Sequence, residues 1–262
     1  MEWSVVTLFQ YLSLENALRV ISAVLCERSV LFVCEDLSVL TSIVLATLPA
    51  ARPLSLQGIF IPLLPTTISD CIEAPVPYII GVPEIPGGES RELEGVVVVD
   101  VVKNKLINHG AVLPQLPDGR ILHERLRVLH QQVFSPRASA QSVSRGSVAR
   151  VALAHSISLR LVEYTQWIVG QVAKHYQQMS SRVGQQQNVS IAQLIKSFTA
   201  AAQSANRPFV NAFISTQQFA MYFHRYIARS QPAPTLSVSA PPQVRSQSVP
   251  AIPTSAPSPI SK

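Results

Sequence analysis

Four short, strongly apolar runs set the tightest constraint on how this chain of 262 residues folds. They read SVLFVC, GIFIP, PYIIGV and GVVVVDVV, and they occupy residues 29–34, 58–62, 77–82 and 95–102. The runs are rich in β-branched residues and lack the regular alternation of apolar and polar side chains that marks a half-solvated strand. We therefore predict strands that are buried on both faces of one sheet.

Helical patterns separate these runs. The segment behind Ser13, a suitable N-cap, repeats leucine and isoleucine at helical spacing. The segment EDLSVLTSIVLATLP restarts a helix that we expect Pro49 to end, and ISDCIEA predicts a short helix capped by Thr66 or Thr67. Strands that alternate with helices predict an α/β fold, in which a largely parallel sheet has helices on both faces.

Prolines punctuate the apolar stretch between the second and third runs. Pro62 and Pro65 follow a predicted strand, where the chain leaves the sheet. Pro75 and Pro77 lead into the next strand, where a missing N–H lies outside the ladder. Each proline thus fixes a loop at a sheet edge and positions the side chains that the loop presents.

The rest of the chain divides by composition. We predict a central α/β module at residues 1–134, a Ser/Arg-rich linker at 135–150, a smaller all-α module at 151–229 and a disordered Pro/Ser-rich tail at 230–262. Within the all-α module, Ser190 heads one predicted helix, and Ser215 with Gln218 forms a capping-box pattern at the start of another.

Charge is distributed unevenly along the chain. Residues 1–124 hold 14 acidic and 7 basic side chains, whereas residues 125–262 hold 14 basic side chains and one acidic, Glu163. This asymmetry favours an acidic partner for the C-terminal half, and the alternative is a solvated basic surface without a specific partner. The basic residues do not form the dense tracts that are typical of nucleic-acid binding, so we expect no nucleic-acid partner.

Motifs for covalent chemistry, metals and cofactors are absent from the sequence. It contains no GxxxxGK[ST], GxGxxG, HExxH or GxSxG pattern. Cys26, Cys34 and Cys71 follow no ligand spacing, which favours core thiols of an intracellular protein. No apolar run reaches the length of a bilayer span, and the N-terminus lacks the features of a secretory signal. We therefore expect neither a cofactor, a metal nor a membrane-spanning segment.

Several motifs resemble the DENN-domain family. The stretch from LSLENAL through CERSVLFVCED, IFIPLLP and APVPYIIGV follows the order of motifs in the central DENN module. VVVVDVVKNKL followed by LPQLP is similar to the end of that module, and RPFVNAFISTQQFAMYFHRY is similar to the downstream DENN module. The resemblance covers roughly residues 8–228.

This resemblance implies a guanine-nucleotide exchange factor for a Rab-type small GTPase in vesicle trafficking, a protein that acts without covalent chemistry. It directs attention to loops at the strand ends as GTPase-binding sites. The implied residues are Cys34, Glu35, Asp36, Pro62, Leu63, Leu64, Pro65, Pro75, Pro77 and Tyr78. Glu27 and Arg28 match the charged pair that precedes the first strand in the family, where we expect a structural role.

The upstream longin-like module of the family is missing from this sequence. The chain is then a truncated remainder of an exchange factor, or it works with a second protein that supplies this module. The alternative function is a non-catalytic GTPase-binding adaptor or scaffold built on the DENN fold. In either case we expect a cytoplasmic protein, peripheral to vesicle membranes, whose basic half contacts an anionic membrane.

Overall fold

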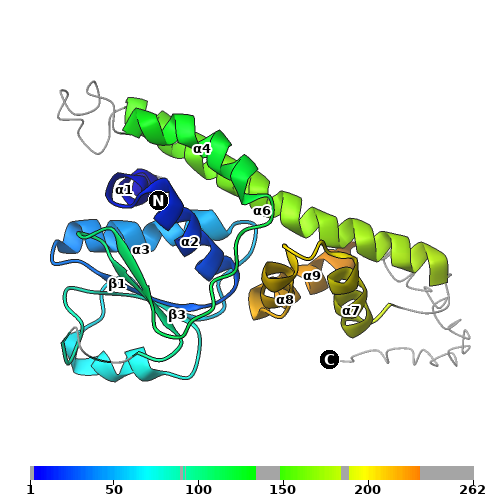
Figure 1. The fold of residues 1–262 in the computed structure, drawn as a ribbon, viewed down its shortest axis with the longest axis horizontal. Helices are drawn as coiled ribbons and strands as arrows, with labels where there is room; N and C mark the ends of the chain where they lie inside the picture. Colours follow the sequence, from blue (N-terminus) through cyan, green and yellow to red (C-terminus); the bar gives the residue numbers. More distant parts are fainter. Residues whose placement is uncertain (1–2, 89–90, 92, 134–147, 184–188, 231–262) are drawn as a thin grey trace, which may run out of the picture.

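A five-stranded sheet organises the computed structural model, which describes residues 3–88, 91, 93–133, 148–183 and 189–230. The strands are β1 (Ser29–Val33), β2 (Ile59–Ile61), β3 (Tyr78–Val82), β4 (Val96–Asp100) and β5 (Lys105–Asn108), in the order β2-β3-β1-β4-β5 (Figure 1). The first four strands run parallel, and β5 pairs antiparallel with β4. The predicted α/β fold with a largely parallel sheet is confirmed, and β5 is an additional strand.

One face of the sheet packs against α-helices. Val30 and Phe32 of β1 and Val97 of β4 are fully buried in a core that these helices share. The helices are α1 (Trp3–Tyr11), α2 (Leu14–Leu25), α3 (Leu37–Ala51), α4 (Gly119–Val133) and α6 (Val148–Val183). Figure 1 shows α4 and α6 side by side above α1 and α3.

The opposite face carries a thinner cover. Leu31, Ile80 and Val98 point to this side and pack with Leu64 and Ile72. Ile72 belongs to the 3-10 helix η1 (Thr66–Glu73), the helix drawn in cyan below the sheet in Figure 1. Helices therefore cover both faces of the sheet, as predicted, although in the part that the structure describes the second face has only the short helix η1.

Helix α1 was not expected from the sequence. Its residues Val5, Leu8 and Phe9 are at most 1% exposed, and the helix packs against α3 and α6. The segment WSVVTLFQY has apolar residues on nearly all sides, so it lacks the 3.6-residue periodicity of a surface helix. A helix that is apolar all round is a buried one, and α1 lies at the centre of the helical layer.

Two helix ends differ from the prediction. Pro65, rather than Thr66 or Thr67, occupies the N-cap of η1 and makes no side-chain capping bond. Helix α3 continues through Pro49 to Ala51. The proline leaves one carbonyl of the preceding turn without its intrahelical N–H partner, and the helix ends two residues later.

The C-terminal part is all-helical, as predicted. It comprises the distal half of α6 with α7 (Ile191–Ala201), α8 (Arg207–Ile214) and α9 (Gln217–Ser230). Phenylalanines from α8 and α9 fill its core in two stacked pairs and one tilted pair, with ring centroids 5.2–5.6 Å apart. Ser190 heads helix α7, as predicted, and forms a capping box with Gln193 there.

The predicted domain boundaries stay a proposal. Helix α6 begins at Val148, within the predicted linker 135–150, and the remainder of that linker lies outside the described residues, as does nearly all of the predicted tail 230–262. The first half of α6 shares one core with α1, α3 and α4. None of the helices that the structure describes is both long enough and apolar enough to cross a membrane.

Candidate functional site

The carboxyl ends of the parallel strands bring two predicted segments together. Cys34 follows β1, and its backbone N–H donates to the carbonyl of Val82 at 3.2 Å. Leu64 follows β2, and its N–H donates to the carbonyl of Gly81 at 2.8 Å. The segments 34–36 and 62–65 therefore lie on either side of the end of β3. Seven of the ten predicted site residues share this edge of the sheet, which we call the carboxyl edge.

Gly81 sets the position of the second segment. A Cβ atom on this residue would lie 2.3 Å from the carbonyl oxygen of Pro62 and 3.1 Å from the side chain of Leu40. No real side chain tolerates the first of these distances, so the close approach of the two backbones requires glycine. The segment that begins at Pro62 is thereby held against β3.

The first segment presents one buried and two exposed side chains. Cys34 is buried, and burial raises the pKa of its thiol, although a hydrogen bond with the backbone of Asp36 partly offsets this. The carboxylate of exposed Asp36 accepts the N–H groups of Ser38 and Val39 at 2.8 and 3.1 Å, which caps α3. Glu35 is exposed and lies beside this cap. The carboxylates of Asp36 and Glu35 thus give this part of the edge a negative charge.

The second segment adds an apolar surface. Leu64 is buried beneath the sheet, whereas the side chain of Leu63 is 38% exposed and Pro65 is exposed. Two further apolar residues near these segments are exposed. Leu37 follows the first segment directly, and Ile68 lies three residues after the second. Sequence reasoning did not single them out. Exposed apolar side chains beside carboxylates are a common composition for protein-binding surfaces.

A third segment reaches the same edge from β4. The carboxylate of Asp100 accepts the backbone N–H of Lys103 at 2.8 Å and forms an ion pair with its ammonium group at 3.2 Å. The N–H of Val101 donates to the carbonyl of Val33 at 3.1 Å, which joins this segment to the end of β1. Sequence reasoning missed Asp100 and Lys103, although their place at the end of a predicted strand was a usable signal.

The remaining predicted residues lie at the opposite, amino edge of the sheet. Pro75 and Pro77 are exposed, and the carbonyl of Pro77 accepts the N–H of Ile59 at 3.0 Å. Tyr78 is buried, its hydroxyl donates to the carbonyl of Ile72 at 2.9 Å, and burial raises its pKa to about 12. The ten predicted residues therefore do not form one surface.

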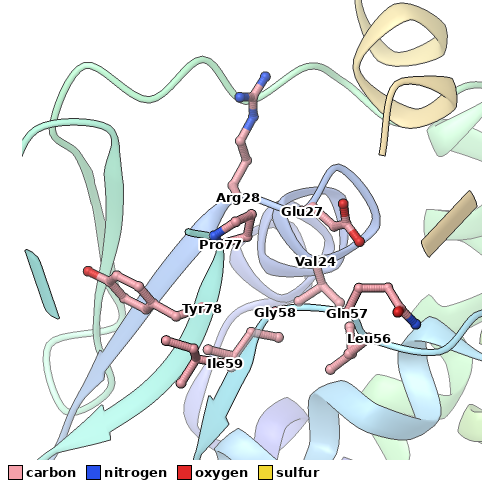
Figure 2. A pocket seen from close by; sticks show the side chains of 10 residues that line it. Val24, Glu27, Arg28, Leu56, Gln57, Gly58, Ile59, Pro77 and Tyr78 are labelled. Atoms are coloured by element: carbon pink, nitrogen blue, oxygen red, sulfur yellow. The ribbon is translucent and has the colours of Figure 1, made fainter. Parts of the chain in front are cut away.

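A shallow cavity of about 20 Å³ lies at this amino edge, between the end of α2 and the starts of β2 and β3 (Figure 2). Its volume suffices for about one water molecule and not for a cofactor. Figure 2 shows the side chains of Glu27 and Arg28 diverging from the corner between α2 and β1. Among the residues that the structure describes, no group of acidic, histidine or cysteine side chains is arranged to hold a metal ion.

Glu27 links the sheet to the C-terminal helices. Its carboxylate accepts the N–H groups of Gln217 and Gln218 at 2.7 and 2.8 Å, at the start of α9. The amide of Gln218 donates back to the carbonyls of Val24 and Leu25 at the end of α2. Glu27 therefore has the structural role that we expected.

The predicted capping box of Ser215 and Gln218 is wrong. The hydroxyl of Thr216 accepts the N–H of Phe219 at 3.2 Å, so Thr216 is the residue that caps α9 from within the helical part. Gln218 is fully buried and directs its amide to the end of α2. Gln218 thus bonds to Val24 and Leu25, which are distant in the sequence, instead of the nearby Ser215.

Comparison with known proteins places a known domain in the first part of the chain. Residues 1–104 match the family model described as "DENN (AEX-3) domain". DENN domain-containing protein 2C of Homo sapiens is 26% identical over 217 residues, covering 81% of this chain and 22% of that protein. DENN domain-containing protein 2A of Mus musculus is 26% identical over 236 residues, covering 87% of this chain and 22% of that protein.

A plant relative matches a shorter stretch. The DENN domain and WD repeat-containing protein SCD1 of Arabidopsis thaliana is 30% identical over 131 residues, which covers 49% of this chain and 11% of that protein. The chain thus spans about a fifth of the length of the DENN domain-containing 2C and 2A proteins. Residues 1–104 thus match the DENN domain, and these relatives extend the similarity to DENN domain-containing proteins across the helices that follow.

Proposed function

We propose that this chain promotes guanine-nucleotide exchange on a Rab-type small GTPase in membrane trafficking. The match to the DENN domain is the observation that carries this proposal, because exchange on Rab-type GTPases is the function that the family implies. Exchange requires no covalent step. A protein that binds the nucleotide-free GTPase more tightly than the loaded form lowers nucleotide affinity by the same factor, through linkage.

The carboxyl edge is the surface that we propose for the GTPase. Glu35, Asp36, Leu63 and Pro65 are exposed there and are available to a partner. The buried side chains of Cys34, Leu64 and Tyr78 are proposed to support the loops from inside, together with the partly buried Pro62.

Pro75 and Pro77 lie at the other end of the strands. A GTPase centred on the carboxyl edge contacts them only if it extends across the sheet. We therefore give these two prolines a secondary place in the proposed binding surface.

Two further partners belong to the same proposal. One is a second protein that supplies the longin-like module, which the resemblance to the DENN family implies. The excess of basic residues after residue 124 supports peripheral contact with an anionic membrane. Both of these partners would bring the chain to a vesicle surface where Rab-type GTPases act.

Binding to a panel of Rab-type GTPases, each prepared nucleotide-free, GDP-bound and GTP-bound, tests the function. We expect one of them to bind best when nucleotide-free, and the chain to accelerate release of a fluorescent GDP analogue from that GTPase. Preference for the GTP-bound form would instead identify a non-catalytic adaptor. If a folded sample binds none of them, the GTPase-binding function is wrong for this chain alone.

A charge reversal locates the surface. Glu35→Lys reverses an exposed carboxylate at the carboxyl edge, and Glu94→Lys makes the same change just before β4, at the amino edge. We expect Glu35→Lys to weaken GTPase binding by about fivefold, since a rim charge of this kind contributes on the order of 1 kcal/mol. Glu94→Lys should leave binding unchanged, and equal effects of the two substitutions would contradict the proposed surface.

A further inference from the structure

The helices after Glu163 carry positive charge only. Residues 164–230 contain six Lys and Arg residues and no Asp or Glu. All six basic side chains are exposed, namely Lys174, Arg182, Lys196, Arg207, Arg225 and Arg229. No carboxylate within this segment neutralises them, so the surface of these helices has a positive potential.

Two adjoining hollows concentrate part of this charge in one groove. The first has a volume of about 600 Å³ and lies between the corner that joins α2 to β1 and helix α8, with Arg28, Pro77 and Asn211 in its lining. The second has a volume of about 470 Å³ and lies between α7 and α8, with Lys196, Arg207 and Asn211 in its lining. Asn211 lines both hollows, which therefore adjoin at this residue, and we call them together the seam groove.

The cations of the seam groove have no acidic partner. The Nε atom of Arg28 is buried and has no hydrogen-bond partner among the described residues. The Arg207 guanidinium donates to the carbonyls of Ala202 and Ala200, at the end of α7, which are neutral groups. Lys196 extends from the exposed side of α7.

The carboxylate of Glu27, the one acidic group among the described residues that line the groove, already binds the start of α9. Both of its oxygens accept backbone N–H groups there, and its side chain diverges from that of Arg28 (Figure 2). The partly buried charge of Arg28 therefore lacks a counter-charge, which buried or partly buried arginines usually have.

We propose that the seam groove binds an extended, acidic peptide segment of a partner protein. Guanidinium and ammonium groups bind carboxylates through charge-assisted hydrogen bonds, and the guanidinium does so with a planar fork that matches the carboxylate. The polar side chain of Asn211, between the cations, is placed to bond the peptide backbone. The lining also contains alanine, proline and isoleucine side chains, which suit small apolar residues between the acidic ones, together with Cys26, Thr199, Ser215 and Thr216.

The lining and the sequence argue against two other occupants. Among the described residues, no aromatic side chain lines either hollow, so the groove lacks the stacking platform of a single-strand nucleic-acid site. The chain itself has no Asp or Glu after Glu163, so its own residues 231–262 cannot supply the carboxylates.

The seam groove is separate from the carboxyl edge. Its residue Pro77 precedes β3, whereas the proposed GTPase surface follows the strands at their other ends. An acidic segment bound there would contact Arg28, at the corner between α2 and β1, together with helix α8. A peptide in the groove therefore leaves the carboxyl edge free, and it shares only Pro77 with the secondary part of the proposed GTPase surface.

Fluorescence anisotropy with the full 262-residue chain tests the proposal. The probe is a fluorescein-labelled peptide of about ten residues, long enough when extended to cross both hollows, with alternating glutamate and alanine. A peptide with glutamine in place of every glutamate is the uncharged control. We expect saturable binding of the acidic peptide, weakening as salt increases, and no saturation with the control.

A matched pair of variants separates the groove from diffuse charge. Lys196→Glu alters a residue of the groove, and Lys174→Glu makes the same change in net charge on α6, outside its lining. Both sites are exposed on helices, so each variant should keep the circular dichroism spectrum and melting temperature of the parent. We expect Lys196→Glu to weaken peptide binding by about tenfold and Lys174→Glu by less than about twofold.

Three results would overturn the proposal. The first is a folded parent chain that does not bind the acidic peptide. The second is an equal loss of affinity in both variants, which would mean that net charge and not the groove attracts the peptide. The third is binding to phosphatidylserine vesicles that competes with the peptide and falls equally in both variants, which would make the basic surface a membrane contact.

Discussion

Glu27 and Gln218 cap each other's helices. The carboxylate of Glu27 accepts the N–H of Gln218 at 2.8 Å at the start of α9, and the Gln218 amide donates at 2.9 and 2.8 Å to the carbonyls of Val24 and Leu25 at the end of α2. Helix starts have free N–H groups and helix ends have free carbonyls, so the exchange satisfies both. It also places a negative charge at the positive end of the α9 dipole.

Removal of the Glu27 carboxylate should loosen this junction. Glu27→Ala leaves two N–H groups of α9 without an acceptor, and we expect it to lower the free energy of unfolding by about 1–2 kcal/mol. Urea denaturation followed by circular dichroism measures the change. Glu94→Ala, at an exposed carboxylate before β4, is the control and should change stability by less than about 0.5 kcal/mol.

A double-mutant cycle tests whether the two caps act together. If Glu27 and Gln218 stabilise one junction, the loss in Glu27→Ala/Gln218→Ala will be smaller than the sum of the two single losses. We expect a coupling of about 0.5–2 kcal/mol, typical of residues in one hydrogen-bond network. Additive losses would mean that the two residues stabilise their helices independently.

Because of the close approach at Gly81, we predict that alanine lowers the free energy of unfolding at this position and raises it at Gly170. Gly81→Ala forces a Cβ atom against the carbonyl of Pro62, so we expect a loss of about 1–3 kcal/mol in the free energy of unfolding. Gly170→Ala adds a Cβ within helix α6, where no described atom outside the adjoining helix backbone lies within 4 Å, and should raise the free energy of unfolding by up to about 1 kcal/mol. A tolerated alanine at Gly81 would contradict the backbone contact that positions residues 62–65.

Much of the sheet follows from local sequence, because strands buried on both faces need nearly continuous apolar runs. The runs at 29–34, 77–82 and 95–102 each contain a strand of the structure. The strand Lys105–Asn108 escaped prediction because it is at the sheet edge, where three of its four residues are exposed and no apolar run is required. The contact of Glu27 with Gln218 joins residues 191 positions apart, and no local pattern predicts it.

Strand direction explains how the predicted site divides. Residues that follow parallel strands share one edge and residues that precede them share the other, so Cys34 and Pro62 come together while Pro77 lies apart. This division could have been derived from the predicted strands alone. Which of the site residues are buried could not be derived in this way. Leu63 and Leu64 are adjacent leucines, and only the pairing of the chain with β3 decides that Leu64 points inward.

The different burial of the three cysteines predicts which thiol reacts first. Burial raises the pKa of Cys26 to about 12 and also raises that of Cys34, so at pH 8 both remain protonated and the reactive thiolate is scarce. Cys71 is partly exposed. With Ellman's reagent at pH 8 we expect one thiol to react rapidly in the folded chain and the other two to react after unfolding in urea. Loss of the rapid phase in Cys71→Ser identifies the residue, and rapid reaction of all three thiols in the folded chain would contradict the burial of Cys26 and Cys34.

Leu63 offers the most direct test of the carboxyl edge, because its side chain is exposed in the segment 62–65, which the backbone contact with Gly81 holds in place. Leu63→Asp puts a charge where an apolar contact is proposed, and we expect it to weaken binding of the nucleotide-free GTPase by about tenfold or more, as for a central residue of an interface. Val112→Asp is the control, since Val112 is 70% exposed in the loop before α4, away from the strand ends. Both variants should unfold at the same urea concentration as the parent, because neither side chain is buried. If Leu63→Asp binds as well as Val112→Asp in a surface plasmon resonance titration, the GTPase does not use this edge, and the amino edge with Pro75 and Pro77 becomes the surface to test.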